Sequence, residues 1–363
     1  MSDFDNLLKE IDDGQTGKNK GISTGNSKLD KYASIRKRIM TLIFSSSGVG
    51  KSAMAHQSFI LEPFEQYCLN PKPVKVILFS MERPKSYILA KWLSRKIFLM
   101  EGVIIPLSAM FGWNEESLTF DQHDLIEQYR DYIDRLTEEF VTIYAGPDNP
   151  TGFRKILREF AESRGKVEQI DEHRKIYLPD KENEIIIPIW DHAGLVKLEP
   201  GNKNGAITNK KQAIDKLVED ASYCRDFYGY SPLFISQINR DLGSVLYQKK
   251  DTFEPTVDHI KETGNIGEAA DVIMSIFDPI RYSTEDKHYN ANAFVNPENG
   301  NKCFRKVTIL KNSYGADGIG IGLGFMGEIG AFKELPKPDK NKEIDPNIYK
   351  KVLNNTYFLQ KNN

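Results

Sequence analysis

The hydrophobic positions at the start of the chain repeat with the period of a helix. Four apolar residues follow the i, i+3, i+4, i+7 spacing of one helix face: Phe4, Leu7, Leu8 and Ile11. The spacing predicts an amphipathic helix over residues 1–13, and the polar, glycine-rich residues 14–20 predict a flexible linker. A helix this short is marginal on its own. Its apolar stripe must be buried on its own domain or on a neighbouring molecule, and the pattern leaves both open.

From residue 21 onward, short apolar runs alternate with longer segments of helical periodicity. The apolar runs predict strands at residues 40–45, 74–80, 140–144, 184–190, 231–235, 271–277 and 306–310. The helical segments are expected at residues 52–59, 84–100, 118–139, 150–164 and 210–227. This alternation predicts an α/β domain with a mostly parallel sheet flanked by helices. We expect the domain to cover residues 21–333, with a charged surface excursion of irregular structure at 168–184 and a polar C-terminal tail at 334–363.

Composition narrows the class of protein. The chain has 363 residues, 40% hydrophobic and 28% charged, which excludes a collagen-like, disordered or disulfide-scaffold chain. The formal net charge is −2, so nucleic-acid binding would have to come from local basic patches. Three widely spaced cysteines exclude a cysteine-rich zinc site and fit a reducing compartment. The acidic N-terminus is not a secretory signal, and the apolar runs are far shorter than the ~20 residues of a membrane span, so we expect a cytoplasmic protein with no membrane partner.

A glycine-rich loop follows the first expected strand and leads into a helix. Residues 45–52 have the sequence SSSGVGKS, which matches the GxxxxGK[ST] pattern of a phosphate loop except that Ser45 takes the place of the first glycine. Small residues let backbone N–H groups approach phosphate oxygens, and the dipole of the following helix favours an anion. Lys51 would contact the β- and γ-phosphates of ATP and the Ser52 hydroxyl would ligate Mg²⁺; the alternative is an ordinary glycine-rich turn. The expected nucleotide-binding residues are Ser47, Gly48, Val49, Gly50, Lys51 and Ser52.

Polar side chains follow three other expected strands. Asp191 ends the third long apolar run and is the best candidate to hold magnesium, although Pro188 cannot donate to a central-strand ladder. Glu82 follows the second strand, where a carboxylate could take a proton from the attacking water. Gln237 is placed to hydrogen-bond a γ-phosphate or that water. The alternatives are an exposed acid at a strand end for Asp191, a surface salt bridge for Glu82 and a solvated amide for Gln237.

In chain order, these segments resemble the motifs of the DnaB-like replicative helicases, specifically their C-terminal RecA-type motor domain. The resemblance runs from about residue 21 to residue 333. Six segments carry it: residues 21–30 (GISTGNSKLD, against GIPTGFxxLD), 79–82 (FSME, against FSLEM), 190–191 (WD, against ID), 236–240 (SQINR, against SQLNR), 261–272 (KETGNI…ADV, against RESGxI…ADV) and 311–318 (KNSYGADG, against KQRNGPTG).

This resemblance implies a function and a set of roles. It implies an ATP-driven homo-hexameric helicase that moves 5′→3′ on single-stranded DNA and unwinds the duplex at a replication fork. It implies Glu82 as the catalytic glutamate, Asp191 as the partner of Ser52 in holding Mg²⁺, and Gln237 as a group that senses the γ-phosphate. Lys311 would reach the γ-phosphate of the neighbouring subunit. A primase, a helicase loader and other replisome proteins are the implied partners.

Three features depart from the family pattern. We expect the N-terminal helical domain of the family to be missing, because only about twenty residues precede the first motif. The arginine finger, the third residue of KQRNG, falls on Ser313, although Lys311 is retained. Ser45 replaces the first glycine of the phosphate loop. The compact length and these departures favour a phage-encoded member of the family.

Two lysine-containing segments correspond to the loops that grip single-stranded DNA in the centre of such rings. They are residues 197–216 and 241–255, and they contain small residues but few aromatic ones. A grip on the DNA backbone therefore fits better than readout of bases. The alternative is that these lysines form a solvated surface. The expected DNA-binding residues are Lys197, Lys203, Lys210, Lys211, Lys249 and Lys250.

Two other classes of function stay open. One is a ring-forming, RecA-like DNA-binding ATPase without unwinding activity, such as a recombination or loading factor; the missing N-terminal domain and Ser313 favour it. The other is a catalytically weak scaffold that uses ATP to assemble. Strand displacement on a forked substrate separates a helicase from the first, and DNA-stimulated ATP turnover separates both from the second.

Overall fold

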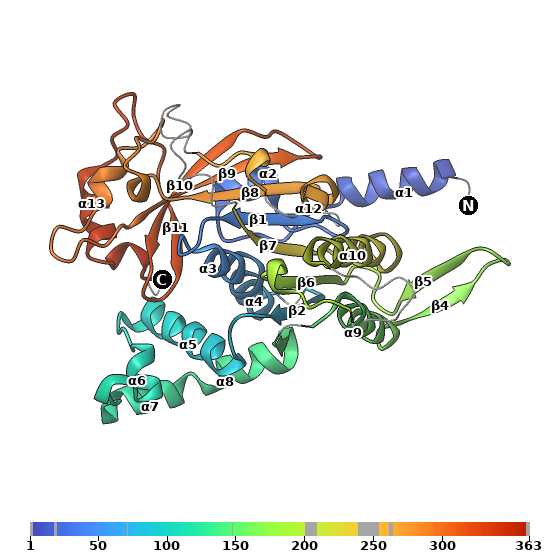
Figure 1. Ribbon diagram of the computed structural model, residues 1–363, viewed down its shortest axis with the longest axis horizontal. Helices are drawn as coiled ribbons and strands as arrows, with labels where there is room; N and C mark the ends of the chain where they lie inside the picture. The colour runs from blue at the N-terminus through green and yellow to red at the C-terminus, as the bar shows by residue number, and fades with distance from the viewer. Residues whose placement is uncertain are drawn as a thin grey trace.

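The sheet at the centre of the protein combines parallel and antiparallel strands. The computed structural model describes residues 3–17, 20–70, 72–146, 148–199, 209–238, 254–260 and 264–360. Within these ranges the sheet consists of β1 (Thr41–Ser45), β2 (Val74–Ser80), β3 (Val141–Ala145), β6 (Ile185–Asp191), β7 (Leu233–Gln237), β8 (Val272–Phe277), β9 (Phe304–Asn312), β10 (Ile319–Met326) and β11 (Ala331–Glu334). Their order is β11-β10-β9-β8-β1-β7-β6-β2-β3 (Figure 1). Neighbours from β8 to β3 are parallel, and β9, β10 and β11 extend the sheet antiparallel.

Helices cover both faces of this sheet. Before β3 they are α1 (Asp3–Gln15), α2 (Ser27–Ala33), α3 (Lys51–His56), α4 (Glu62–Leu69), α5 (Lys85–Glu101), α6 (Leu107–Phe111), α7 (Phe120–Gln128) and α8 (Arg130–Arg135). After β3 they are α9 (Pro150–Glu162), α10 (Lys210–Tyr223), α12 (Gly264–Ala269) and α13 (Pro346–Leu353). The helix expected at 118–139 is divided into α7, α8 and a π-helical turn, and a second π-helical turn joins α3 to α4.

The central strands are buried on both faces. Successive side chains of a strand point to opposite sides of the sheet. In β2, Val76 and Leu78 join the core that contains α3, α4 and α5, whereas Ile77 and Phe79 join the core that contains α9 and α10. Parallel strands that are covered on both faces have such continuous apolar sequences. The protein is therefore a three-layer α/β/α domain, which confirms the expected fold class.

The proline in β6 falls in a gap of one ladder. The Ser231 N–H donates to the Ile186 carbonyl at 2.9 Å, and regular pairing between β6 and β7 begins only at Ile189. On its other side, β6 pairs with β2 along its whole length. Because that second ladder is complete, Pro188 stays within the sheet and Asp191 lies at the carboxyl end of the strand.

Two segments are more regular than the sequence indicated. The expectation of irregular structure at 168–184 is wrong, because an antiparallel hairpin, β4 (Gly165–Gln169) and β5 (Lys175–Pro179), occupies much of it and projects from the domain (Figure 1). The C-terminal residues pack against β9 and β10 and bury four apolar side chains: Leu335, Ile344, Val352 and Phe358. The boundary expected at residue 333 falls inside β11.

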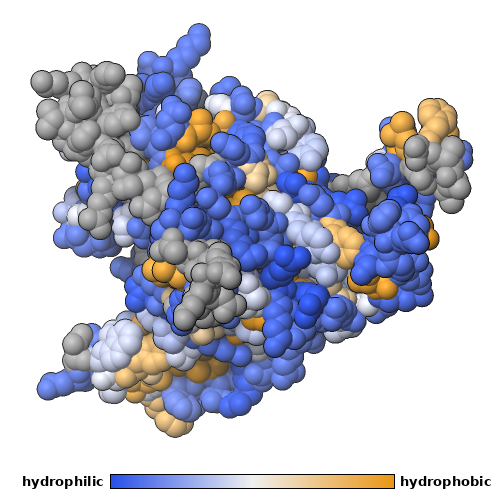
Figure 2. All heavy atoms as spheres, turned by 45° about the vertical axis from the view of Figure 1, so that its right-hand side comes forward, coloured by the Kyte–Doolittle hydropathy of each residue, from blue (hydrophilic) through white to orange (hydrophobic). Residues whose placement is uncertain are grey.

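Helix α1 projects from the domain and keeps its apolar stripe exposed (Figure 1). The exposed fractions are 64% for Phe4, 49% for Leu7, 43% for Leu8 and 47% for Ile11. An exposed ion pair joins Lys9 to Glu182 at 3.4 Å. The face seen in Figure 2 is mostly hydrophilic, with hydrophobic atoms in a few small areas. Along the ranges that the structure describes, no helix is long and apolar enough to cross a membrane.

Candidate active site

The carboxyl ends of four adjacent strands meet at one edge of the sheet. The register places Ser45, the last residue of β1, opposite Gln237 of β7. It also places Ser80, the last residue of β2, opposite Asp191 of β6. The phosphate loop continues directly from β1, so it lies at the same edge. In an open α/β sheet, ligands bind at this edge.

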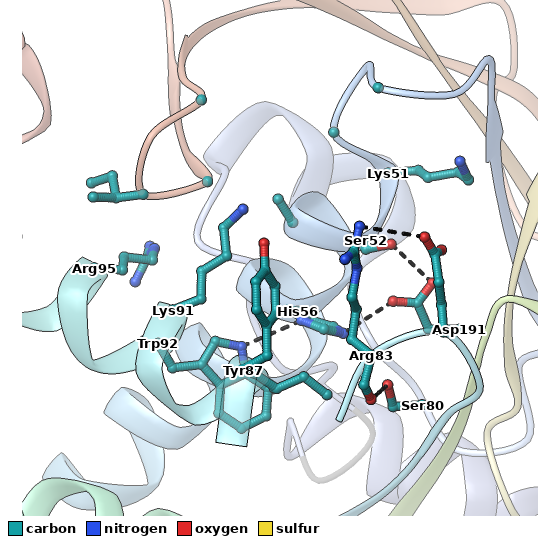
Figure 3. Close-up of a pocket in the computed structure, with 18 of the residues that line it drawn as sticks. Lys51, Ser52, His56, Ser80, Arg83, Tyr87, Lys91, Trp92, Arg95 and Asp191 are labelled. Atoms are coloured by element: carbon teal, nitrogen blue, oxygen red, sulfur yellow. Dashed lines mark hydrogen bonds and ion pairs between the residues drawn. The ribbon is translucent and has the colours of Figure 1, made fainter. Parts of the chain in front are cut away.

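A cavity of about 420 Å³ opens at this edge (Figure 3). The expected site residues that line it are Ser47, Gly48, Gly50, Lys51, Ser52, Glu82, Asp191 and Gln237. Side chains that the sequence did not single out also line it: His56, Arg83, Tyr87, Lys91, Trp92 and Arg95. The turn between β10 and β11 closes the cavity on the other side. The structure thus brings nearly all of the expected catalytic and nucleotide-binding residues to one concave surface.

The phosphate loop requires glycine at two of its positions. Gly48 and Gly50 have φ values of 77° and 109°, in the region that side chains disfavour. A Cβ atom on Gly50 would lie 2.9 Å from the ring of Phe332. Ser45 is a buried residue within β1, and its backbone is not left-handed. The first glycine of the pattern is therefore replaced at a position whose backbone conformation accepts serine.

Two arginines hold the carbonyl groups of this loop from beneath. The buried Arg305 of β9 donates from Nε to the Val49 carbonyl at 2.9 Å and forms an ion pair with Asp278 at 3.1 Å. Arg281 donates to the Ser47 carbonyl. Because the carbonyls face these arginines, the loop is fixed in place, and the first N–H groups of α3 have no acceptor within the helix. They remain available to an anion.

Lys51 is a nearly buried cation. Its exposed fraction is 7%, and no residue in the described part of the chain forms a hydrogen bond or ion pair with its ammonium group. Burial lowers its pKa, and the negative charges of Asp191 and Glu82 oppose that shift. A buried ammonium group that faces a cavity is suited to binding an anion, and phosphate is the anion that this loop geometry accommodates.

Ser52 and Asp191 form a pair of oxygen ligands. The Ser52 hydroxyl donates to Asp191 Oδ1 at 2.9 Å, although the two residues are 139 positions apart. Burial by itself would raise the pKa of Asp191, but the contacts with His56 and Ser52 outweigh it, so the pKa is lowered and the side chain is a carboxylate. Mg²⁺ prefers such oxygen ligands and is usually bound by one or two carboxylates together with phosphate oxygens. These two residues therefore fit a magnesium ion.

Glu82 and Gln237 lie at the open side of the cavity. The Glu82 carboxylate is about half exposed and lies 3.5 Å from the guanidinium group of Arg83, which itself lies over the ring of Tyr87. Gln237 Nε2 lies 3.5 Å from His192 Nε2. Neither group is consumed by a strong internal contact. Both remain accessible to a water molecule or a phosphate bound at Lys51.

One wall of the cavity comes from a single face of α5 and the residues just before it. Arg83, Tyr87, Lys91 and Arg95 are spaced four residues apart, which places them one above another. Burial, with a smaller effect of Arg83, lowers the pKa of Lys91. Arg95 forms a buried ion pair with Glu62 at 3.1 Å. The four-residue spacing of cations and an aromatic residue was a signal available in the sequence.

The residues expected to reach a neighbouring subunit lie away from this cavity. Lys311 Nζ donates to the carbonyls of Gly267 and Glu268 at 3.2 and 3.0 Å. Ser313 follows β9, and its N–H donates to the Asp271 carbonyl. Neither residue can act on a nucleotide in the cavity of its own subunit. A role for Lys311 in a neighbour's site stays a prediction.

The expected DNA-binding lysines are only partly within the described residues. Lys197 and Lys211 are exposed, and Lys210 donates to the Val196 carbonyl. That contact joins the two sides of the first lysine-containing segment. Lys203, Lys249 and Lys250 lie outside the described residues, as do Asn239, Arg240 and residues 261–263 of the matching motifs.

The motif at residues 21–30 has a structural role. Asp30 accepts hydrogen bonds from the backbone N–H and the hydroxyl of Thr24, both at 2.7 Å. It also accepts a hydrogen bond from the hydroxyl of Ser23. These contacts close the turn that precedes α2, and none of the three residues lines the cavity.

Solved structures share this fold without close sequence similarity. The sequence matches no protein-family model and no curated protein. The structure is similar to the ATPase domain of a phage helicase, with a TM-score of 0.67 and 16% identity over 92% of this chain and 99% of that chain. It is also similar to a DnaB-like replicative helicase studied with its interactions with primase, with a TM-score of 0.65 and 16% identity over 93% of this chain and 67% of that chain. The chain thus has the fold of a DnaB-like helicase ATPase domain, which confirms the resemblance drawn from the motifs.

Proposed function

We propose that this protein is the ATPase motor of a DnaB-like replicative DNA helicase, which hydrolyses ATP with Mg²⁺, moves along single-stranded DNA and unwinds duplex. The observation that carries the proposal is the 2.9 Å contact between Ser52 and Asp191 beside the nearly buried Lys51. It joins a phosphate loop to an acid on another strand, which is the arrangement that P-loop enzymes use to hold Mg²⁺ and the β- and γ-phosphates.

The residues around the cavity supply separate parts of such a reaction. The N–H groups of the loop and Lys51 would bind the phosphates and stabilise negative charge that develops during transfer. Mg²⁺ held by Ser52 and Asp191 would neutralise part of that charge. Glu82, about half exposed at the open side, is positioned to accept a proton from the attacking water. Gln237 is positioned to hydrogen-bond that water or the γ-phosphate.

A ring of several copies accounts for the residues that lie away from the cavity. Lys311 cannot reach the cavity of its own subunit, and helix α1 exposes an apolar stripe that its own domain does not cover. Both features fit a homo-hexamer in which each subunit contacts the next, and in which the segments containing Lys197 and Lys211 face single-stranded DNA. A primase and a loader are partners that this function would require.

A forked-duplex unwinding assay with the wild type and Lys51→Ala tests the proposal. We expect strand displacement that requires ATP and Mg²⁺ in the wild type and none in the variant. Lys85→Ala is a matched control, because Lys85 is exposed at the start of α5 and does not line the cavity. DNA-stimulated ATP hydrolysis without strand displacement would instead identify a RecA-like DNA-binding ATPase, and hydrolysis that does not respond to DNA would contradict both.

A further inference from the structure

One histidine lies directly behind the expected magnesium ligand. His56 follows Ser52 by four residues on α3, so the two side chains lie on the same face of the helix, one turn apart. Both reach the same carboxylate: the Ser52 hydroxyl is 2.9 Å from Asp191 Oδ1, and His56 Nε2 is 3.5 Å from Asp191 Oδ2. Each oxygen of Asp191 therefore has its own neighbour on α3.

A tryptophan determines which nitrogen of His56 carries the proton. Trp92 Nε1, on α5, lies 3.3 Å from His56 Nδ1, and the two rings meet edge to face (Figure 3). An indole N–H can only donate, so Nδ1 must be the acceptor. A neutral imidazole that accepts at Nδ1 carries its hydrogen on Nε2. The N–H of His56 is thus directed to the side where Asp191 lies.

The surroundings offer His56 Nε2 no other use. The atom is buried, and no other acceptor in the described residues is within hydrogen-bond distance of it. A buried N–H without an acceptor costs about 1–3 kcal/mol. The separation of 3.5 Å exceeds the usual ~2.9 Å of an N–H···O bond. A small rotation of the Asp191 carboxylate toward His56 would shorten it and would fix the plane of that carboxylate.

We propose that His56 is a positioning residue that, oriented by Trp92, fixes the carboxylate of Asp191 for binding magnesium. This inference rests on the proposed function, because it assigns a role within the same ATPase site. With Oδ2 held by His56, Oδ1 is directed toward Ser52 and the phosphate loop. Groups that orient a metal ligand from behind in this way typically change metal affinity or activity by ~10–100-fold when they are removed.

The test measures metal binding directly. Mn²⁺ is titrated in place of Mg²⁺ and followed by electron paramagnetic resonance, in the presence of a non-hydrolysable ATP analogue. We expect His56→Leu to weaken Mn²⁺ binding by ~10-fold or more. His56→Gln, which keeps an N–H donor, should recover part of that loss. Trp92→Phe should shift affinity in the same direction by a smaller factor, because it frees the tautomer but leaves the imidazole.

Two controls separate positioning from packing. His123→Leu alters an exposed histidine of α7 and should leave Mn²⁺ affinity unchanged. Binding of the same analogue in EDTA should be equal in the wild type and His56→Leu, since the loop and Lys51 are untouched. A variant that merely disturbed α3 would weaken nucleotide binding with and without metal.

The outcomes distinguish this inference from the proposed function. A folded His56→Leu with wild-type Mn²⁺ affinity would overturn the role of His56 while the ATPase assignment stands. If His56→Leu does not fold, the same titration is made on His56→Asn, whose shorter side chain cannot reach Asp191, and unchanged affinity there has the same meaning. A wild-type protein that binds no Mn²⁺ together with the nucleotide would overturn the proposed function and this inference together.

Discussion

Helix α1 offers the most direct test of assembly. Its four apolar residues remain 43–64% exposed although they form one stripe, and its side-chain contact with the domain is an exposed ion pair between Lys9 and Glu182. A 13-residue helix in water is marginal on its own. We therefore predict that the stripe packs on a neighbouring subunit, and that deleting residues 1–13 shifts the protein toward monomers and lowers DNA-stimulated ATP hydrolysis together.

The exposed fractions set the size of the effect. Together they are equivalent to about two fully exposed side chains. Burying one large apolar side chain contributes roughly 1.5–3 kcal/mol, so covering the rest of the stripe would contribute roughly 3–6 kcal/mol per interface. A stripe that began fully exposed would give ~6–10 kcal/mol. Ordering the helix and its linker offsets part of this, and we expect a net ~1–3 kcal/mol, or ~5–150-fold in association at each interface.

Sedimentation velocity over a range of protein concentrations measures the shift. The wild type, the deletion and a Leu7→Ser/Leu8→Ser variant are compared with and without a non-hydrolysable ATP analogue. Asp12→Ser, on the polar face of α1, is the matched control and should assemble as the wild type does. The analogue should strengthen assembly in all four proteins if Lys311 contacts a nucleotide bound to the next subunit.

Equal distributions of oligomers for the wild type and the deletion would refute this reasoning. The stripe would then have no part in assembly, and another partner would have to cover it. Loss of assembly in the deletion but not in Leu7→Ser/Leu8→Ser would assign the effect to the backbone or charges of α1 rather than to apolar burial. Assembly should weaken in both variants.

Three further predictions concern catalysis and DNA. Lys51→Ala should lower ATP turnover by at least ~10² while circular dichroism and the unfolding temperature stay near wild type, because developing charge loses its cation; near-normal turnover would contradict the phosphate-loop assignment. Glu82→Gln should bind ATP but hydrolyse it ~10²–10⁴-fold more slowly in a single-turnover assay; equal losses of binding and turnover would give Glu82 a structural role. DNA affinity should fall steeply with salt, and Lys210→Ala/Lys211→Ala should flatten the slope of log K against log salt by ~1–1.5, whereas Lys350→Ala on α13 should not; an unchanged slope in the double variant would place the DNA site elsewhere.

The parts of the fold that sequence reasoning predicted depend on local patterns. The central strands are continuous apolar runs because both of their faces are covered, and such runs are visible without knowledge of their neighbours. The phosphate loop is visible because the positive φ values of Gly48 and Gly50 demand glycine at fixed spacing. The general rule that ligands bind at the carboxyl ends of parallel strands then joined Asp191 to Ser52.

The errors in the expected fold arose where local patterns carry little information. The hairpin of β4 and β5 projects from the domain with both faces partly exposed, so it lacks the single apolar face that marks a strand. The C-terminal residues Leu335, Ile344, Val352 and Phe358 are too widely spaced to form a period. They are buried because β9 and β10 present an apolar surface to them, and only the tertiary structure brings that surface near.

The supporting residues of the site were missed for the same reason. Arg305 reaches the carbonyl of Val49 from a strand that follows 256 residues later, and nothing near either residue indicates the contact. His56 is different, since its four-residue spacing from Ser52 already places both on one face of a helix. What the sequence does not give is the register that brings the end of β6 against that face, with Trp92 behind it. The identity of a metal ligand can therefore be predicted from a motif, but the residues that orient it depend on packing between elements that are distant in the chain.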